Sequence, residues 1–219
     1  MARPVAAPTD QLIDALPPAV ARLAARGSVR RYARGALVIE EGDFGDTLYI
    51  ILAGRLRAFS SNPDTGREIT FGNYGAGEYV GELGLDGGPR SASIEVVEAC
   101  VCSVIARATL VGYIAEQPDF AFELLAKVIR RARAATVTAR QLALNDVYGR
   151  VKLLLESLAE PDADGALAVH ERLTHRDIAN RVGCSREMVS RVFKDLENGA
   201  YIANAGRGLR LLRPLPARW

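Results

Sequence analysis

Cysteine, histidine and long apolar runs are scarce in this 219-residue chain. The three cysteines stand at positions 100, 102 and 184, and the two histidines are His170 and His175. So few cysteines, odd in number, do not build a disulfide framework, and we expect a reducing compartment. Two histidines five residues apart do not supply the cluster of His and carboxylates that metal-dependent hydrolysis uses. We therefore predict that the chain is not an enzyme and that it carries no metal or cofactor.

No apolar run approaches the length of about 18 residues that crosses a membrane. The N-terminal stretch MARPVAAPTDQLIDALPP also lacks the unbroken apolar segment of a signal peptide. We expect a cytoplasmic protein without membrane association. The composition, with 49% hydrophobic and 25% charged residues, predicts a globular chain with a sizeable core. The length suits one large domain or two small ones.

Two of the cysteines lie inside the apolar run ACVCSVIA. Alternation along a β-strand places Cys100 and Cys102 on the same face of that strand. Such a pair either packs in the core or binds a metal. Because no second cysteine pair and no nearby histidine completes a metal site, we predict that both thiols are core residues.

The net charge of +2 is unevenly distributed. Residues 171–219 contain ten Lys or Arg and five Asp or Glu, whereas residues 1–170 contain eighteen and twenty-one. The basic charge is therefore concentrated near the C-terminus. This asymmetry predicts a segment that faces nucleic acid, attached to a near-neutral body.

Three regions follow one another along the chain. Residues 10–27 are typical of short helices, and residues 29–108 contain short β-rich runs separated by glycine-bearing turns, which predicts a sandwich or barrel. A long helical region follows, and then a segment with further helices and a terminal hairpin. We place the domains at 1–116 (β-rich, with N-terminal helices), 117–145 (long helix) and 146–219 (DNA-binding).

The long helical region has an apolar heptad seam. Its positions follow 4-3-4-3 steps: Ala121, Leu125, Val128, Ala132, Ala135, Ala139 and Leu142. The helix either packs on its own β domain or pairs with a second copy. Its length and the arginines on its other face favour a homodimer formed through residues 117–145.

The stretch LTHRDIANRVGCSREMVSRVFKDLENG predicts a helix-turn-helix at residues 173–199. Thr174 can cap the first helix, with Asp177 as its reciprocal partner. Gly183 supplies the turn, Ser185 can cap the second helix and Gly199 ends it. The following YIANAGRGLRLL predicts a two-stranded wing, in which Arg207 and Arg210 are candidates for contacts to the DNA backbone.

The second helix of such a motif enters the major groove with its N-terminal residues first. Here those positions hold Arg186, Glu187 and Arg191. Arginine can bind guanine O6 and N7, and glutamate can accept from cytosine N4. Thr174, Ser185 and the helix N-terminal amides can hold phosphates. The alternative is that these charges only face water, but the capping signals, the turn and the local basic charge favour DNA binding.

A glycine-rich loop, VGELGLDGGPRSAS, occupies residues 80–93. Its glycines allow backbone amides to surround an anion, and Arg90 with Ser91 can complete a phosphate site. Glu82 is an acceptor that suits a sugar hydroxyl. Together these groups predict a site for a small ribose phosphate. A salt bridge between Glu82 and Arg90 across a hairpin explains the same residues equally well.

This loop resembles the phosphate-binding cassette of cyclic-nucleotide-binding β-rolls. The segments GCSREMVSRV, EEGDFGDTLYIILAGRLRAF and DVYGRV resemble the helix-turn-helix, first roll strands and interdomain hinge of the cyclic AMP receptor and fumarate-nitrate regulator family. The resemblance covers roughly residues 28–212, in the family's order. It implies an α+β fold with an N-terminal, jelly-roll-like β-roll, a long dimerisation helix and a C-terminal winged helix-turn-helix.

The resemblance also implies roles for the loop residues. Glu82 is expected to hold the ribose 2′-hydroxyl, and Arg90 and Ser91 the cyclic phosphate. The backbone amides of Gly81 and Leu83 lie nearby. The effector implied is a cyclic mononucleotide, with cyclic AMP as the first candidate.

Counting back from the hinge Asp146 without gaps implies three further ligand residues. Arg131 falls where the cyclic AMP receptor has an arginine that supports the pocket glutamate. Ala135 and Thr136 fall where that receptor has a Thr-Ser pair that contacts the adenine. The side chain of Ala135 cannot form a hydrogen bond, so the choice of base is open, and Thr136 or Thr138 is a candidate substitute.

On the DNA side, Arg186, Glu187 and Arg191 match the family and imply a TGTGA-like half-site in an inverted repeat. The resemblance also implies RNA polymerase as a partner. Two branches are disfavoured: no cysteine precedes Cys100 to bind an iron-sulfur cluster, and neither histidine lies in the β-roll to bind haem. The alternative prediction is a regulator of the same build that needs no nucleotide or senses another ligand, such as cyclic GMP or cyclic di-GMP.

Overall fold

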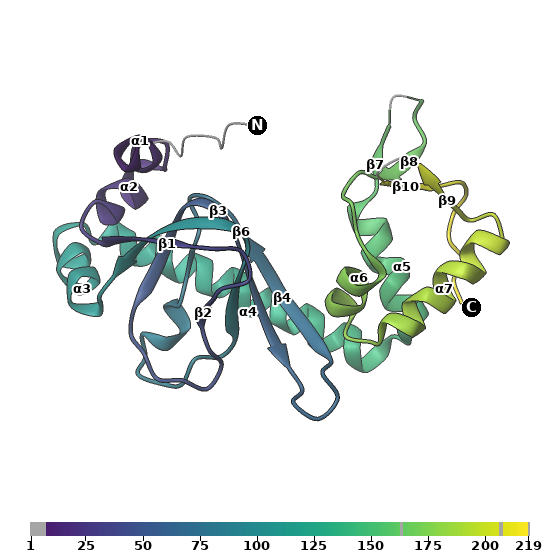
Figure 1. Ribbon diagram of the computed structural model, residues 1–219, viewed down its shortest axis with the longest axis horizontal. Coiled ribbons are helices and arrows are strands. Elements are labelled where there is room, and N and C mark those ends of the chain that lie inside the picture. Colours follow the sequence, from purple (N-terminus) through teal and green to yellow (C-terminus); the bar gives the residue numbers. More distant parts are fainter. Residues whose placement is uncertain (1–7, 163, 206–207, 219) are drawn as a thin grey trace. The chain divides into compact units, whose positions relative to one another are not determined.

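The computed structural model describes residues 8–162, 164–205 and 208–218 (Figure 1). The chain divides into two compact units. The first comprises residues up to Ser60 together with Phe71–Arg133, and the second comprises Ser61–Thr70 together with Ala134–Trp219. No helix among the described residues is long and apolar enough to cross a membrane.

The N-terminal elements run from α1 to β6, with η1 a short 3-10 helix. Their bounds are α1 (Thr9–Asp14), α2 (Pro18–Ala24), β1 (Ser28–Tyr32), β2 (Leu37–Ile39), β3 (Leu48–Ser61), β4 (Glu68–Tyr74), β5 (Tyr79–Val80), η1 (Glu82–Gly84) and β6 (Ser93–Ile105). The remaining elements are α3 (Arg107–Glu116), α4 (Asp119–Leu144), α5 (Val147–Leu158), β7 (Glu160–Pro161), β8 (Leu167–Val169), α6 (His175–Val182), α7 (Arg186–Asn198), β9 (Ile202–Ala205) and β10 (Gly208–Leu211).

The strands of the first unit form the predicted β-roll. Their order is β1-β6-β3-β4, with β2 paired to β6 and β5 paired to β3. One strand, β3, continues through a glycine, because Gly54 interrupts it without ending it. Its φ is +85°, and an added Cβ would lie 2.3 Å from the carbonyl oxygen of Ala99 on β6. The register between β3 and β6 shifts here, so the glycine marks a bulge inside a strand rather than a turn.

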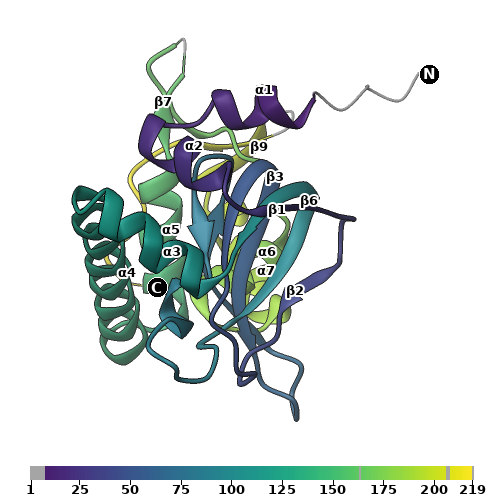
Figure 2. The same ribbon diagram turned by 90° about the vertical axis from the view of Figure 1, so that its left-hand side faces the viewer.

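Alternation along β3 builds a core on each side of the sheet. Leu48, Ile50 and Leu52 pack with α2 and α3 on one side, while Ile51 and Leu56 face the other. Figure 2 shows α1 and α2 at one end of the sheet. The hydroxyl of Ser103 on β6 donates to the carbonyl of Ala24 at the end of α2 at 2.6 Å.

Cys100 and Cys102 belong to the second of these cores. They are 2% and 0% exposed, and their sulfur atoms lie 3.5 Å apart. Burial and the hydrogen bond with Cys100 raise the pKa of the Cys102 thiol. The prediction that both are core residues is confirmed.

Helix α4 presents two different faces. Phe120 and Leu124 pack against the core of the roll. The heptad seam lies elsewhere on the helix. Most of its residues are exposed, with Leu125 at 53% and Leu142 at 41%, whereas Ala121 and Val128 are half-buried. Packing on the roll therefore leaves most of the seam uncovered.

The second unit has its own core, between α5, α6, α7 and a small sheet ordered β7-β8-β10-β9. Helix α5 begins at the hinge, where the Asp146 carboxylate accepts a 2.7 Å hydrogen bond from the amide of Gly149. The fully buried apolar side chains come from all three helices: Val151, Leu155, Ile178, Val189 and Leu196. Two strands of the sheet, β9 and β10, form the predicted wing.

Candidate functional site

Arg90 is a buried cation held by neutral oxygens. The residue is 7% exposed. Its Nη1 donates to the carbonyl of Gly81 at 2.7 Å, and its Nη2 lies 3.1 Å from both the carbonyl and the hydroxyl of Thr47. Main-chain hydrogen bonds fix its position, since its amide donates to the carbonyl of Asp43 and its carbonyl accepts from the amide of Gly42. A guanidinium has five N–H donors, so two remain for a further acceptor.

Three glycines make room for this guanidinium. An added Cβ would lie 3.0 Å from an Arg90 nitrogen at Gly45 and at Gly81, and 2.9 Å at Gly84. Gly81 also has a φ of +95°, which other residues rarely adopt. The sequence argument assigned two of these glycines, Gly81 and Gly84, to backbone amides around an anion. The structure adds a second reason, because a side chain at any of the three positions would displace Arg90.

Glu82 is a buried carboxylate at the start of η1. Its side chain is 1% exposed, and Oε1 forms an ion pair with Nη1 of Arg131 from α4. Neither carboxylate oxygen has a hydrogen bond of ordinary geometry among the described residues. Burial makes an unused acceptor costly, so Oε2 is suited to accept from a ligand hydroxyl.

Arg131 links the cassette to α4. Its Nη2 donates to the carbonyl of Tyr79, and its guanidinium lies 4.5 Å from the ring centre of Tyr74 on β4. One turn earlier on the helix, Lys127 lies 4.0 Å from the ring centre of Tyr79. Burial lowers the pKa of Lys127 and raises that of Tyr79. These contacts hold α4 against the cassette through charged and aromatic groups.

The salt bridge between Glu82 and Arg90 does not form among the described residues. Glu82 pairs with Arg131 instead, and Arg90 binds carbonyls, so two charged groups are left with capacity for a ligand. The other predicted loop residues lie at the rim of this site: Gly81 is half-buried, whereas Leu83 and Ser91 are exposed.

Two predicted ligand residues are not part of this cluster. Ala135 and Thr136 lie further along α4 and are exposed. They belong to the second compact unit, whereas Glu82, Arg90 and Arg131 belong to the first. The structure therefore brings Glu82, Arg90 and Arg131 together, and the roles expected of Ala135 and Thr136 stay predictions.

The helix-turn-helix has the capping interactions that the sequence predicts. The Thr174 hydroxyl accepts from the amide of Asp177, and the Asp177 carboxylate accepts from the amide of Thr174 at 2.8 Å, which completes the capping box. Gly183 adopts the left-handed conformation between α6 and α7, with φ 66°. The Ser185 hydroxyl accepts from the amide of Met188 and caps α7.

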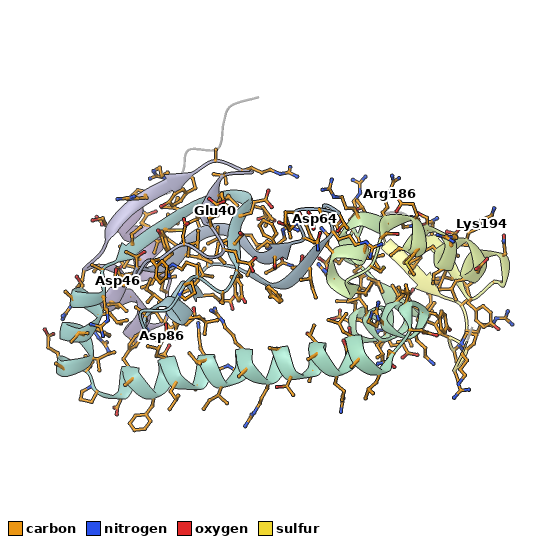
Figure 3. All side chains as sticks on the ribbon, turned by 90° about the horizontal axis from the view of Figure 1, so that it is seen from below. Glu40, Asp46, Asp64, Asp86, Arg186 and Lys194 are labelled. Carbon is orange, nitrogen blue, oxygen red and sulfur yellow. The ribbon has the colours of Figure 1, made fainter. Side chains whose placement is uncertain are left out.

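Helix α7 separates its apolar and charged residues. Val189, Phe193 and Leu196 are buried, while Arg186, Glu187 and Arg191 are exposed. Figure 3 shows Arg186 and Lys194 projecting away from the helix. Hydrogen bonds from its own amide and from the Ser185 side chain lower the pKa of Glu187. The three predicted base-reading residues thus share one accessible surface.

The hydroxyl groups predicted to hold phosphates already have local partners. Thr174 Oγ1 lies 2.6 Å from the Asp177 carboxylate, and the Ser185 hydroxyl is bonded to Met188 and Glu187. The amides at the N-termini of α6 and α7 are the remaining local donors for a phosphate.

The wing and the end of α7 differ from the sequence expectation. Arg210 forms an ion pair with Asp162 in the loop between β7 and β8, and Arg207 lies outside the described residues. Helix α7 ends at Asn198 before Gly199, as predicted, but Gly199 has φ −79°. The left-handed residue is Ala200, with φ 53°, because the chain reverses one position later.

Several contacting residues were missed by sequence reasoning. Thr47 and Gly45 contact Arg90 from the loop before β3, and Tyr74 contacts Arg131 from β4. The glycine pattern GDFGDT around Gly45 was a signal in the sequence, although nothing local connects it to residue 90. No sequence pattern indicated a role for Tyr74.

The two units together define a class of protein. One contains a β-roll with a buried arginine and a buried carboxylate that has spare acceptor capacity. The other contains a winged helix-turn-helix with arginines exposed on its second helix. This combination is typical of transcription regulators that join a nucleotide-binding fold to a DNA-binding fold.

Comparison with known proteins agrees with this class. Residues 29–117 match the cyclic nucleotide-binding domain, and residues 172–200 match the bacterial regulatory proteins of the crp family. The chain is 34% identical, over 88% of its own length and 88% of the relative's, to a "CRP-like cAMP-activated global transcriptional regulator" of Mycobacterium tuberculosis. It is 32% identical, over 82% and 87% respectively, to the "cAMP-activated global transcriptional regulator CRP" of Escherichia coli. The chain therefore belongs to the CRP family of bacterial transcription regulators.

A solved structure supports the fold. The c-di-GMP responsive global regulator CLP of Xanthomonas campestris superposes with a TM-score of 0.77 at 27% identity, covering 89% of this chain and 98% of that one. The predicted α+β fold with β-roll, long helix and winged helix-turn-helix is confirmed.

Proposed function

We propose that the chain is a homodimeric transcription regulator whose affinity for an inverted-repeat, TGTGA-like operator is controlled by a cyclic mononucleotide. Cyclic AMP is the first candidate. Glu82 and Arg90 are the residues that bind it, with Ser91 at the rim and Arg131 in support. Both relatives described above are named as cyclic AMP-activated, which supports this choice.

The observation that carries the proposal is the set of partners that Arg90 and Glu82 have in the cassette. Arg90 is a buried cation whose described partners are neutral oxygens, and Glu82 is a buried carboxylate without an ordinary hydrogen bond. A phosphate supplies the counter-charge that Arg90 lacks. A sugar hydroxyl supplies the donor that Glu82 lacks. A ribose with a cyclic phosphate carries both groups at a short separation.

Coupling to α4 follows from the ion pair between Glu82 and Arg131. A ligand hydroxyl that donates to Glu82 adds a partner to the carboxylate that Arg131 already holds. The position of α4 against the roll then depends on whether the ligand is bound. This is the differential contact that a population shift between two states requires.

Dimer formation is supported by the exposed seam of α4. Leu125 at 53% and Leu142 at 41% exposure lie on the heptad face, apart from the face that packs on the roll. Burying such a seam against a second copy removes apolar surface from water. Leu125→Glu should convert the dimer to a monomer in light scattering. Val111→Glu, at a position on α3 with 53% exposure, is the matched control and should leave the mass unchanged.

DNA recognition is assigned to α7. Arg186 and Arg191 are proposed to bind guanines, and Glu187 a cytosine, in each half-site. Two copies place two such helices on a palindrome about 34 Å apart. Thr174 and Ser185 cap the helices whose N-terminal amides face the phosphates. RNA polymerase is the further partner proposed from family membership.

Calorimetric titration with cyclic AMP, cyclic GMP and cyclic di-GMP tests the effector. Cyclic AMP should bind, and Arg90→Leu should abolish binding while Arg107→Leu, at an exposed arginine on α3, should not. Operator affinity measured with and without the bound nucleotide then tests control. If no cyclic mononucleotide binds at millimolar concentration, the proposed effector is wrong.

Cyclic di-GMP is the second candidate effector, favoured by the likeness to the Xanthomonas regulator. A regulator that needs no nucleotide is the third possibility, and it predicts equal operator affinity in the presence and absence of every nucleotide tested. Ala135 is exposed, and its side chain cannot form a hydrogen bond with a base. This residue therefore favours the two alternatives over control by cyclic AMP.

A further inference from the structure

A hydrogen bond joins the two helices of the helix-turn-helix at the surface proposed to meet DNA. Nδ1 of His175, the first residue of α6, lies 2.9 Å from Oγ of Ser190 on α7. The imidazole packs against the ring of Phe193, with centres 4.8 Å apart. Ser190 is one turn beyond Arg186 and one turn before Lys194, so the three share a row on α7. A titratable ring therefore contacts a hydroxyl in the middle of that row.

The proton on Nδ1 decides what the Ser190 hydroxyl can do. In the neutral tautomer that carries its proton on Nε2, Nδ1 accepts the single hydroxyl hydrogen of Ser190, which is then unavailable to another acceptor. When the imidazole is protonated, Nδ1–H donates to Oγ, and the hydroxyl hydrogen is released for another acceptor. Protonation also adds a positive charge at the start of α6. Both changes favour an anionic, acceptor-rich partner such as the DNA backbone.

The carboxylates around His175 are occupied by other partners. His175 lines a hollow of about 510 Å³ together with Glu171 and Arg172, which precede α6, and Glu197 on α7. Glu171 pairs with Arg181 at 2.5 Å, Glu197 accepts from Asn204 at 3.4 Å, and Asp177 is engaged in the capping box. No carboxylate lies within ion-pair distance of His175 among the described residues. A DNA phosphate is therefore the anion available to stabilise its protonated form.

We propose that His175, acting with Ser190, makes DNA binding proton-linked: the protonated imidazole contributes a backbone contact that the neutral one does not. This inference rests on the proposed DNA-binding function of α7. The sign follows from linkage, because a proton taken up on binding makes the affinity for DNA higher at low pH than at high pH.

The test is fluorescence anisotropy of the full-length protein, with and without cyclic AMP, between about pH 6 and pH 8, where imidazoles titrate. Two labelled duplexes serve as probes: an inverted TGTGA repeat and a scrambled sequence. Wild-type affinity for both should be roughly three- to tenfold higher at the lower pH. The slope of log affinity against log salt should steepen there by about 0.9, which is one additional phosphate contact.

The chain has only two histidines, which provides a matched control. His175→Gln retains a partner for Ser190 but does not titrate, so it should remove the pH dependence. His170→Gln, at an exposed position, should keep the wild-type profile. Because His175→Gln can disturb folding, thermal unfolding of both variants is compared, and Ser190→Ala, which should reduce the ratio between the two pH values, is the second variant.

The outcomes separate the two proposals. Wild-type binding that does not vary with pH, or a pH dependence that His175→Gln retains, overturns the inference and leaves the DNA-binding proposal intact. Absence of binding to either duplex at every pH, with and without cyclic AMP, overturns both.

Discussion

The cassette and the recognition helix place their charged residues in opposite environments. In the cassette, Glu82 and Arg90 are 6% and 7% exposed, so protein atoms cover most of their surface. On α7, Arg186, Glu187 and Arg191 are exposed above an apolar face. Burial leaves each cassette charge with one geometry before any ligand arrives. The charges on α7 keep their rotamer freedom and lose it only on contact with DNA.

This difference teaches where specificity is encoded in each region. A buried charge needs a partner. The acceptor capacity of Glu82 and the donor capacity of Arg90 that protein groups leave unused therefore indicate which groups a ligand must supply. An exposed charge needs none, so the arginines of α7 do not describe their target by themselves. The helix caps and the packing of α7 supply the position, and the base edges supply the partner.

The largest expected effect comes from filling the space around Arg90. In Gly84→Ala the new Cβ would lie 2.7 Å from the Gly45 carbonyl oxygen and 2.9 Å from Arg90 Nη1. Displacing the guanidinium should weaken nucleotide binding about 100-fold, since charge-assisted hydrogen bonds contribute about 1.5–3 kcal/mol each. Calorimetry measures this loss. In Gly88→Ala, the control in the same loop, the new Cβ would contact only the Asp86 side chain, so nucleotide affinity should match wild type. Wild-type affinity in Gly84→Ala would show that Arg90 is not the phosphate ligand.

Glu82→Gln removes the buried charge and keeps the shape of the side chain. Nucleotide affinity should fall about 10- to 100-fold, because the acceptor becomes neutral and Arg131 loses its ion-pair partner. The matched control is Glu116→Gln, which breaks the exposed pair with Arg26. That variant should bind nucleotide like wild type. If Glu82→Gln keeps wild-type affinity, the buried Glu82 contributes no more to nucleotide binding than an exposed carboxylate does.

Arg186→Ala tests the exposed side of the comparison. The loss of one bidentate contact should cost about 1–3 kcal/mol and relax specificity at one base pair. Lys194→Ala, two turns further along the same row of α7, should instead weaken binding to all sequences alike and reduce the salt slope by about 0.9. Competition between operator and scrambled duplexes measures both. A uniform loss in Arg186→Ala would assign this residue to the backbone rather than to a base.

The smallest effect is expected at the end of α7, where no charge is involved. Ala200 has φ 53°, a conformation that costs a side chain about 1–2 kcal/mol and glycine nothing. Ala200→Gly should raise the free energy of unfolding by up to about 1 kcal/mol, because the relief of this strain exceeds the extra chain entropy that glycine loses on folding. Urea denaturation measures the change. Gly199→Ala should not stabilise the protein, since an added Cβ would lie 2.8 Å from the Tyr201 ring.

Sequence patterns predicted the elements whose hydrogen bonds are local. The capping box of Thr174 and Asp177 spans three residues, and the turn at Gly183 follows directly from its helix. The apolar face of α7 follows from helical periodicity alone. Such patterns do not decide whether β3 continues through Gly54, because a glycine in a bulge and a glycine in a turn look alike until the partner strand is known.

Partners across the fold were beyond such patterns. Arg90 contacts Thr47, which is 43 residues away, through the pairing of strands in the roll. The choice between a salt bridge to Arg90 and an ion pair with Arg131 was open for Glu82 until α4 was placed on the roll. Likewise, the bond between His175 and Ser190 depends on how α6 packs against α7.

The sequence by itself determined the order of the β-roll, long helix and helix-turn-helix. Strand alternation, the heptad pattern and the helix caps each depend on residues that are close together in the chain. Only the tertiary structure decided that Glu82 and Arg90 are both buried and not paired with each other. The physical reason is that a buried charge takes its partner from whatever the fold brings within hydrogen-bond distance, and that distance is set by strand register and helix docking rather than by neighbours in the chain.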